Sequence, residues 1–87
     1  MGQFIDEHKN SLQTEVIGEI AKHLGVTPQD IDVNAELSDD LGLGPVEMAD
    51  LIGAISLKFD VNFNPQDLST IKSVHDLVVA VEDLSLE

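Results

Sequence analysis

The chain contains no cysteine, tryptophan or tyrosine, and its aromatic residues are three phenylalanines, 3% of its 87 residues. Without cysteine it can form neither a disulfide framework nor a thiolate metal site. Hydrophobic residues nevertheless make up 43% of the chain, so its core must be aliphatic. An aliphatic core suits packed helices better than a small sheet. The length suits a single domain over residues 1–87.

Positive charge is also scarce. Four lysines and no arginine face 17 acidic residues, which gives a formal net charge of −13. Nucleic acid and anionic membrane surfaces are therefore poor partners, because binding phosphates requires Lys and Arg. The acidity either steers the chain towards a basic protein partner or serves solubility alone, and composition does not separate these two.

Long apolar runs and targeting patterns are missing as well. No apolar stretch approaches the roughly 20 residues of a membrane span, and the first residues do not have the pattern of a signal peptide. We expect a cytoplasmic protein without a membrane span.

What the sequence does contain is helical periodicity. Apolar residues recur at helical spacing in three stretches, which predict long helices over residues 4–24, 45–59 and 74–84. A cap, proline and acid pattern at Asn64-Pro65-Gln66-Asp67 predicts a short helix over 65–70, and Thr27-Pro28 predicts a single turn ending near Ile31. The segment from there to Gly44 is a long loop, and its apolar residues indicate that it is packed. Together these elements predict an antiparallel all-α bundle.

The predicted core follows the apolar faces of these elements. We expect the following residues to be mostly buried: Leu12, Val16, Ile20, Leu41, Leu51, Ile55, Phe59, Phe63, Ile71, Val74, Leu77, Val78 and Val81. The helix over 45–59 is apolar around much of its circumference, which indicates a central position or an exposed apolar face. Gly53 within it either permits the close approach of a neighbour or an acyl chain, or is simply tolerated.

No catalytic or metal-binding constellation is present. The histidines His8, His23 and His75 are scattered, and no pair of carboxylates is marked out for acid–base work. Asp30, Asp32 and Asn34 mimic the start of a calcium-binding loop. The match then fails, because Ala35 replaces the turn glycine and Leu41 replaces the bidentate glutamate. We predict neither an enzyme nor a metal site.

Several short motifs resemble the acyl carrier protein family in order and spacing, from about Leu12 to Leu84. They are Leu24-Gly25-Val26, Asp39-Asp40-Leu41-Gly42-Leu43, Phe59-Asp60 and Ile71-Lys72-Ser73-Val74-His75-Asp76-Leu77. The resemblance implies a bundle of three long helices and one short helix with a long first loop. It also implies a role in fatty-acid or polyketide-type metabolism.

The resemblance fails at the family's functional residue. Acyl carrier proteins bear 4'-phosphopantetheine on the serine of an Asp-Ser-Leu motif at the start of the second long helix. Gly44, Pro45 and Val46 occupy these three positions here. Pro45 has no hydroxyl, so we predict no cofactor. Proline at the first helical position and glycine as its cap leave the fold intact. We interpret the change as natural divergence, since an engineered knock-out more commonly uses alanine.

The resemblance also implies partners, namely the basic surfaces of acyl-transfer or biosynthetic enzymes, and a monomeric chain. The contacts implied for such a partner are Asp39, Asp40, Val46, Glu47, Met48 and Asp50. Ser56, Leu57 and Lys58 stand where the family commonly has a run of acids, so part of the usual acidic face is lost.

Three hypotheses follow. The chain is a non-carrying relative that acts through protein–protein interaction, or a conventional carrier altered at its attachment site or modified elsewhere, or a helical module that holds an acyl chain non-covalently.

Overall fold

A computed structural model describes the backbone of residues 3–85 and the side chains of residues 12–85. Within this part of the chain the elements are α1 (Gln3–Leu24), the 3-10 turn η1 (Pro28–Asp30), α2 (Pro45–Phe59), α3 (Pro65–Thr70) and α4 (Val74–Leu84). The described residues form no strand, and among them one isolated antiparallel β-bridge pairs Glu36 with Ser73. The predicted all-α fold is confirmed.

The helix ends lie where the local sequence places them. At the end of α1, Gly25 has φ = 72° and its N–H donates to the carbonyl of Ala21 at 2.8 Å. This left-handed conformation favours glycine. Asn64 with Asp67 and Ser73 with Asp76 form the capping boxes that begin α3 and α4. The four helices therefore match the predicted ranges to within one residue.

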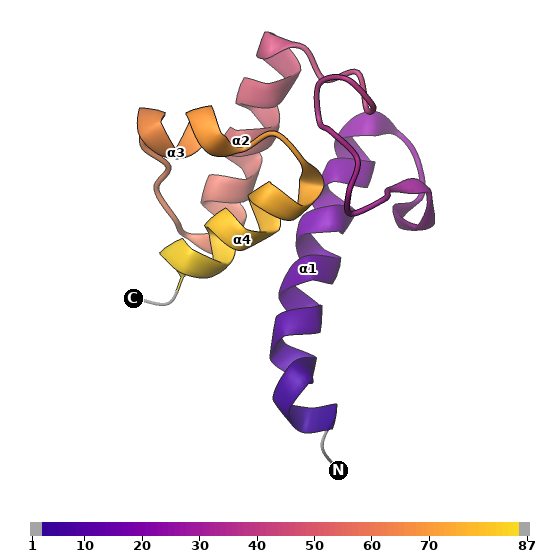
Figure 1. The fold of residues 1–87 in the computed structure, drawn as a ribbon, viewed down its shortest axis with the longest axis vertical. Coiled ribbons are helices and arrows are strands. Elements are labelled where there is room, and N and C mark those ends of the chain that lie inside the picture. Colours follow the sequence, from indigo (N-terminus) through magenta and orange to yellow (C-terminus); the bar gives the residue numbers. More distant parts are fainter. Residues whose placement is uncertain (1–2, 86–87) are drawn as a thin grey trace.

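The helices form a small bundle in which α1 packs against both α2 and α4. In Figure 1, α2 runs back along the C-terminal half of α1, and α4 starts beside α1 and crosses the C-terminal part of α2 obliquely in this view. The N-terminal part of α1 extends beyond the other helices, and the long loop between η1 and α2 packs at the opposite end of the molecule. No helix among the described residues is both long and apolar enough to cross a bilayer.

The core is aliphatic and contains no buried polar side chain among the described residues. Its members are Val16, Ile20, Ala21, Ile31, Leu37, Leu43, Leu51, Ile55, Ile71, Val74, Leu77, Val78 and Val81. Helices α1, α2 and α4 each contribute to this cluster, and three leucine or isoleucine side chains come from the long loop. The loop is thus part of the core.

Four residues of the predicted core are less buried than expected. Leu12, Leu41, Phe59 and Phe63 are half-buried and pack against the edge of the cluster. Phe59 is the last residue of α2 and Phe63 lies in the following connection, where fewer elements cover them. Five residues outside the predicted core are buried, namely Ala21, Ile31, Leu37, Leu43 and Val61.

Candidate functional site

The start of α2 is the position at which the sequence predicts the family's functional residue. Gly44 precedes the helix in an extended conformation, with φ = −80° and ψ = −179°, and Pro45 is the first helical residue. The helix begins as the N–H of Met48 donates to the carbonyl of Gly44 at 2.8 Å. Proline fits this position because its fixed φ is helical and its missing N–H has no helical partner there. Pro45 is exposed.

A carboxylate of the chain itself lies over this helix start. A Cβ atom built on Gly44 would stand 2.9 Å from Oε1 of Glu47. Glu47 is the third residue of α2, from which a glutamate commonly reaches back towards the cap residue. Negative charge is favourable at this end of a helix because unpaired N–H groups and the helix dipole point there.

The loop before α2 is held by its own hydrogen bonds. The N–H of Glu36 donates to Oδ2 of Asp40 at 2.8 Å, and the carbonyl of Glu36 accepts from Asp40 and Leu41 at 2.9 and 3.0 Å. The N–H of Leu43 donates to the carbonyl of Leu37 at 3.0 Å, and both leucine side chains are buried. The hydrogen-bonded loop therefore fixes the position of Pro45 at the start of α2.

The same loop is bonded to the junction between α3 and α4. Leu37 donates its N–H to the carbonyl of Lys72 at 2.8 Å, and Val74 donates to the carbonyl of Ala35 at 3.0 Å. A third bond of 2.9 Å joins the N–H of His75 to the carbonyl of Val33. These bonds therefore fix the loop that leads to α2 against residues 72–75, which lie far along the chain.

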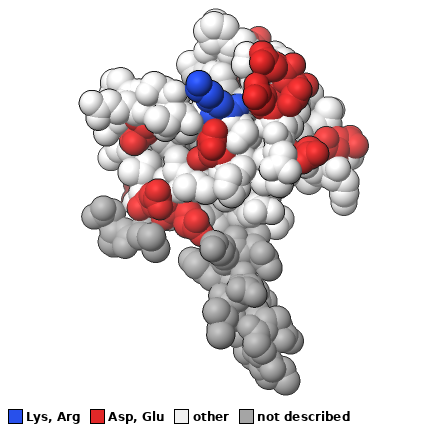
Figure 2. Space-filling model, in the orientation of Figure 1, with Lys and Arg blue, Asp and Glu red and all other residues white. Residues whose placement is uncertain are grey.

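The acidic residues of this loop form an exposed cluster. Glu36, Asp39 and Asp40 are exposed, and acidic surface is gathered beside the loop on the face shown in Figure 2. The pKa of Glu36 is raised above its usual value because its protonated form can donate a hydrogen bond to Asp39 and because the negative charge of Asp39 disfavours ionisation, while the charge of Lys72 opposes this shift.

Most of the implied partner contacts are accessible around α2. Val46, Glu47 and Asp50 are exposed on the helix, as are Asp39 and Asp40 in the loop. Met48 differs, because it is half-buried and packs against the core. It forms part of the wall of a groove of about 440 Å³, together with Leu37, Ile71 and Lys72.

Leu57 was predicted only to interrupt the family's acidic face, and Gly53 either to permit a close approach or to be tolerated. In the structure Leu57 is 87% exposed and Gly53 is exposed as well. The signal for their common exposure was the spacing of Val46, Asp50, Gly53 and Leu57, which puts them on one line along α2.

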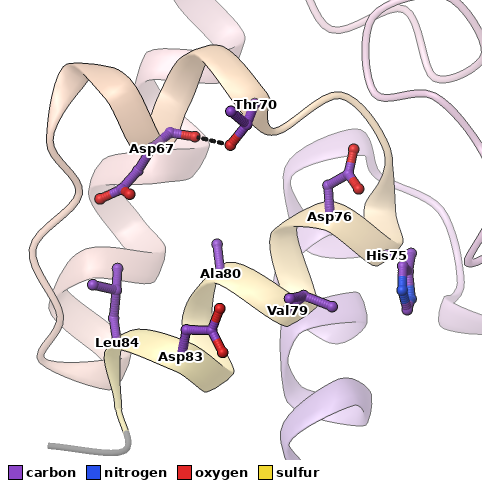
Figure 3. A pocket seen from close by; sticks show the side chains of 8 residues that line it. All are labelled: Asp67, Thr70, His75, Asp76, Val79, Ala80, Asp83 and Leu84. Atoms are coloured by element: carbon purple, nitrogen blue, oxygen red, sulfur yellow. Dashed lines mark hydrogen bonds between the residues drawn. The ribbon is translucent and has the colours of Figure 1, made fainter.

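A second groove lies between α3 and α4, away from the start of α2. It has a volume of about 360 Å³ and carboxylates on several sides, including Asp67, Asp76 and Asp83 (Figure 3). Two of these carboxylates already serve the capping boxes, and Thr70 Oγ1 donates to the carbonyl of Asp67 at 2.9 Å. This groove therefore consists largely of groups engaged in helix ends.

Comparison with known proteins identifies the family. The family described as "Phosphopantetheine attachment site" matches residues 14–81. An acyl carrier protein of Syntrophobacter fumaroxidans is 31% identical over 67 residues, which cover 77% of this chain and 83% of the relative. The chain belongs to the acyl carrier protein family.

Other acyl carrier proteins match over similar lengths. The protein of Chlamydia trachomatis serovar L2 is 26% identical over 73 residues, 84% of this chain and 95% of its own. That of Bdellovibrio bacteriovorus is 30% identical over 63 residues, 72% of this chain and 81% of its own. Acyl carrier proteins are carriers that work with biosynthetic enzymes, so the chain is not an enzyme.

The residues at the helix start do not fit the family's prosthetic group. Attachment of 4'-phosphopantetheine requires a hydroxyl, and the first residue of α2 is Pro45. Ser56 is half-buried further along α2 and donates to the carbonyl of Val61, while Ser73 caps α4. Ser38 is exposed, but it lies within the hydrogen-bonded turn before the helix, where its carbonyl accepts from Gly42 at 3.1 Å. None of these hydroxyls stands at a helix start free to be modified.

Proposed function

We propose that this acyl carrier protein relative bears no 4'-phosphopantetheine and acts through protein–protein interaction in fatty-acid or polyketide-type metabolism. The observation that carries the proposal is Pro45 at the first position of α2, in an otherwise intact family fold. Since proline has no side-chain oxygen, no phosphodiester can form there.

The proposed partner is a basic surface of a biosynthetic or acyl-transfer enzyme. Four acidic residues are exposed here, Glu47 and Asp50 on α2 and Asp39 and Asp40 in the loop before it, and the side chain of Val46 is exposed as well. With a net charge of −13, the chain attracts basic proteins over a distance, which raises the rate of encounter. Action as a monomer in the cytoplasm stays a prediction.

Intact mass spectrometry tests the proposal. The purified chain is incubated with coenzyme A and a permissive phosphopantetheinyl transferase, with the Syntrophobacter fumaroxidans acyl carrier protein as a positive control in a parallel reaction. We expect the control to gain the mass of the prosthetic group and this chain to keep its mass. A gain on any serine of this chain would show that it is a carrier modified at an unexpected residue.

The groove beside Met48 supports a second candidate, non-covalent binding of an acyl chain. Its wall combines the apolar side chains of Leu37, Met48 and Ile71 with Lys72 and with the carboxylates of Glu36 and Asp39, so the apolar part can contact an acyl chain while the charges at its edge are mixed. This candidate is tested by titrating the delipidated chain with a fatty acid while the NMR chemical shift of the Met48 methyl group is measured. Shifts that appear elsewhere, or none at all, would exclude this groove.

A further inference from the structure

The groove beside Met48 brings an apolar wall and charges of both signs together. Its volume of about 440 Å³ lies within the range of small-molecule sites. Leu37 and Ile71, which line it, are buried, and Met48 is half-buried. The other lining residues are polar and exposed, namely Glu36, Ser38, Asp39 and Lys72. The groove thus combines apolar contact area with one cation and two carboxylates.

Backbone contacts join the two segments that supply these charges. The N–H of Leu37 donates to the carbonyl of Lys72 at 2.8 Å. The neighbouring residues Glu36 and Ser73 form the isolated antiparallel bridge. The backbone on both sides of the groove is therefore held in place by the fold itself, so a ligand does not have to order it on binding.

The three charges of the groove act on one another. The pKa of Glu36 is raised by Asp39 and lowered by Lys72, and the effect of Asp39 is the larger. Lys72 therefore compensates only part of the repulsion between the two carboxylates. A further positive charge beside Glu36 and Asp39 would relieve the rest, whereas the ammonium group of Lys72 favours an anion.

We propose that this groove binds a single-chain amphiphile whose head group is zwitterionic. The alkyl chain contacts the apolar wall, the anionic part of the head group pairs with Lys72, and the cationic part lies beside Glu36 and Asp39. A head group of one sign meets only one of these partners and places a like charge near the other. The net charge of −13 further disfavours a purely anionic ligand. The inference rests on the second candidate of the proposed function, non-covalent binding of an acyl chain, and adds the class of head group.

Four ligands separate the contributions of chain and charge. Octylphosphocholine is zwitterionic, octanoate is anionic and octyltrimethylammonium is cationic, while glycerophosphocholine has the zwitterionic head group without the chain. Each is titrated below its micelle concentration into the delipidated chain, and the affinity is taken from backbone amide NMR shifts. Salt at about 0.15 M screens the general attraction of the acidic chain for cations.

Octylphosphocholine should bind most tightly of the four. We expect its affinity to be about three- to fivefold higher than that of either singly charged ligand, as for one exposed charge pair. It should exceed that of glycerophosphocholine at least about tenfold, because the octyl chain buries apolar surface. The amide shifts should be centred on residues 36–39, Met48 and residues 71–72.

Two variants of the groove, each with a matched control, assign the charges. Lys72→Gln should weaken the binding of octylphosphocholine and octanoate about three- to fivefold without weakening that of octyltrimethylammonium. Asp39→Asn should weaken octylphosphocholine and octyltrimethylammonium about threefold without weakening octanoate. Lys58→Gln and Asp83→Asn make the same changes of net charge at exposed residues outside the groove, and should alter each affinity less than about twofold. Circular dichroism confirms that each variant remains helical.

A membrane is a second source of the same head group. Vesicles of phosphatidylcholine present it at their surface, with the alkyl chains enclosed in the bilayer. We expect the chain not to co-sediment with these vesicles, because the apolar wall must contact the alkyl chain. Co-sedimentation would assign the preference to a membrane surface and overturn the proposal.

The remaining outcomes distinguish this inference from the function on which it rests. If octanoate binds at the groove as tightly as octylphosphocholine, the zwitterionic preference is refuted and acyl-chain binding stands. Equal effects of the groove variants and their controls would also refute the preference. If no octyl ligand shifts the amides of the groove, both fail. Mass spectrometry of the same sample tests the non-carrying function separately.

Discussion

Oε1 of Glu47 lies 2.9 Å from the point at which a Cβ atom on Gly44 would stand. This contact involves only the far end of a flexible side chain, so Glu47 can move aside if position 44 gains a side chain. Here the chain places its own carboxylate at the helix end that would otherwise attract an anion. The local structure is therefore compatible both with the present sequence and with a restored attachment motif.

Leu51 and Ile55 of α2 are fully buried. We predict that Leu51→Ala or Ile55→Ala lowers the free energy of unfolding by about 2–5 kcal/mol, because each leaves a cavity in the aliphatic core. Small domains have total stabilities of about 5–15 kcal/mol, so the loss is large. Urea denaturation measures it. Leu57→Ala on the exposed face is the matched control and should change stability by less than about 0.5 kcal/mol. Unchanged midpoints in both core variants would refute this packing.

Asp76 should stabilise the fold at neutral pH. Its Oδ2 accepts hydrogen bonds from the N–H groups of Lys72 and Ser73 at 3.0 and 3.1 Å, and these bonds lower the pKa of Asp76 below its usual value of 3.8. Because the folded state favours the ionised form, this stabilisation is present above pH 3.8 and is lost as the pH falls through the lower, folded pKa. Asp76→Asn should therefore be less stable than the parent at pH 7, and the difference in urea midpoint should narrow at acid pH.

Glu36 provides an internal control, because its ionisation should change the stability of the fold in the opposite direction. Asp39 raises the pKa of Glu36 above 4.5, so ionised Glu36 opposes folding once the pH rises through the folded pKa. Glu36→Gln should be more stable than the parent at pH 7 and equal to it below about pH 4.5. A pH-independent difference for both variants would contradict this electrostatic account.

Salt should stabilise the chain because its net charge is −13. Ions screen the repulsion among carboxylates in the compact state, and divalent cations do so at lower concentration. We predict that the midpoint of thermal unfolding rises in NaCl and that MgCl2 or CaCl2 gives the same rise at lower concentration. Calorimetry at matched ionic strength measures both series. A midpoint of thermal unfolding that stays constant in both salt series would show that charge repulsion does not significantly lower the stability of the fold.

Much of the fold could be predicted because its signals are local. Pro45, Pro65 and Ser73 mark helix starts through the chemistry of one or two residues, and α2, α3 and α4 begin where these residues indicate. The turn after Thr27 was also predicted, although Thr27 makes no capping bond to the backbone and its hydroxyl instead donates to Oδ2 of Asp30 at 3.0 Å.

The packing of the long loop could not be predicted in the same way. Leu37 and Leu43 are fully or almost fully buried, yet a loop has no periodicity that reveals which side chains point inward. Leu37 is fixed by a bond to Lys72, 35 residues later in the chain. The position of Pro45 at the functional helix start was predictable from motif spacing, whereas the contact between Glu47 and Gly44 depends on a side-chain conformation.

Restoring the attachment motif should restore the prosthetic group. The double variant Gly44→Asp with Pro45→Ser supplies a hydroxyl at the start of α2, where N–H groups and the helix dipole favour a phosphodiester. The aspartate meets only the end of Glu47, and the loop that positions the helix is held by Leu37 and Leu43, which the variant leaves in place. We therefore expect a folded protein with unchanged helicity that gains the mass of 4'-phosphopantetheine from a permissive transferase.

The single variants make this test specific. Gly44→Asp alone should remain unmodified because Pro45 still lacks a hydroxyl, and Pro45→Ser alone shows whether the aspartate is needed by the transferase. If the double variant folds but stays unmodified, recognition by the transferase is lost elsewhere on α2. Leu57 and Lys58 are then the residues to replace with glutamate, since both are exposed and lie at the end of the same helix. Modification of the double variant, with none of the parent, would place the loss of carrier function at Gly44 and Pro45.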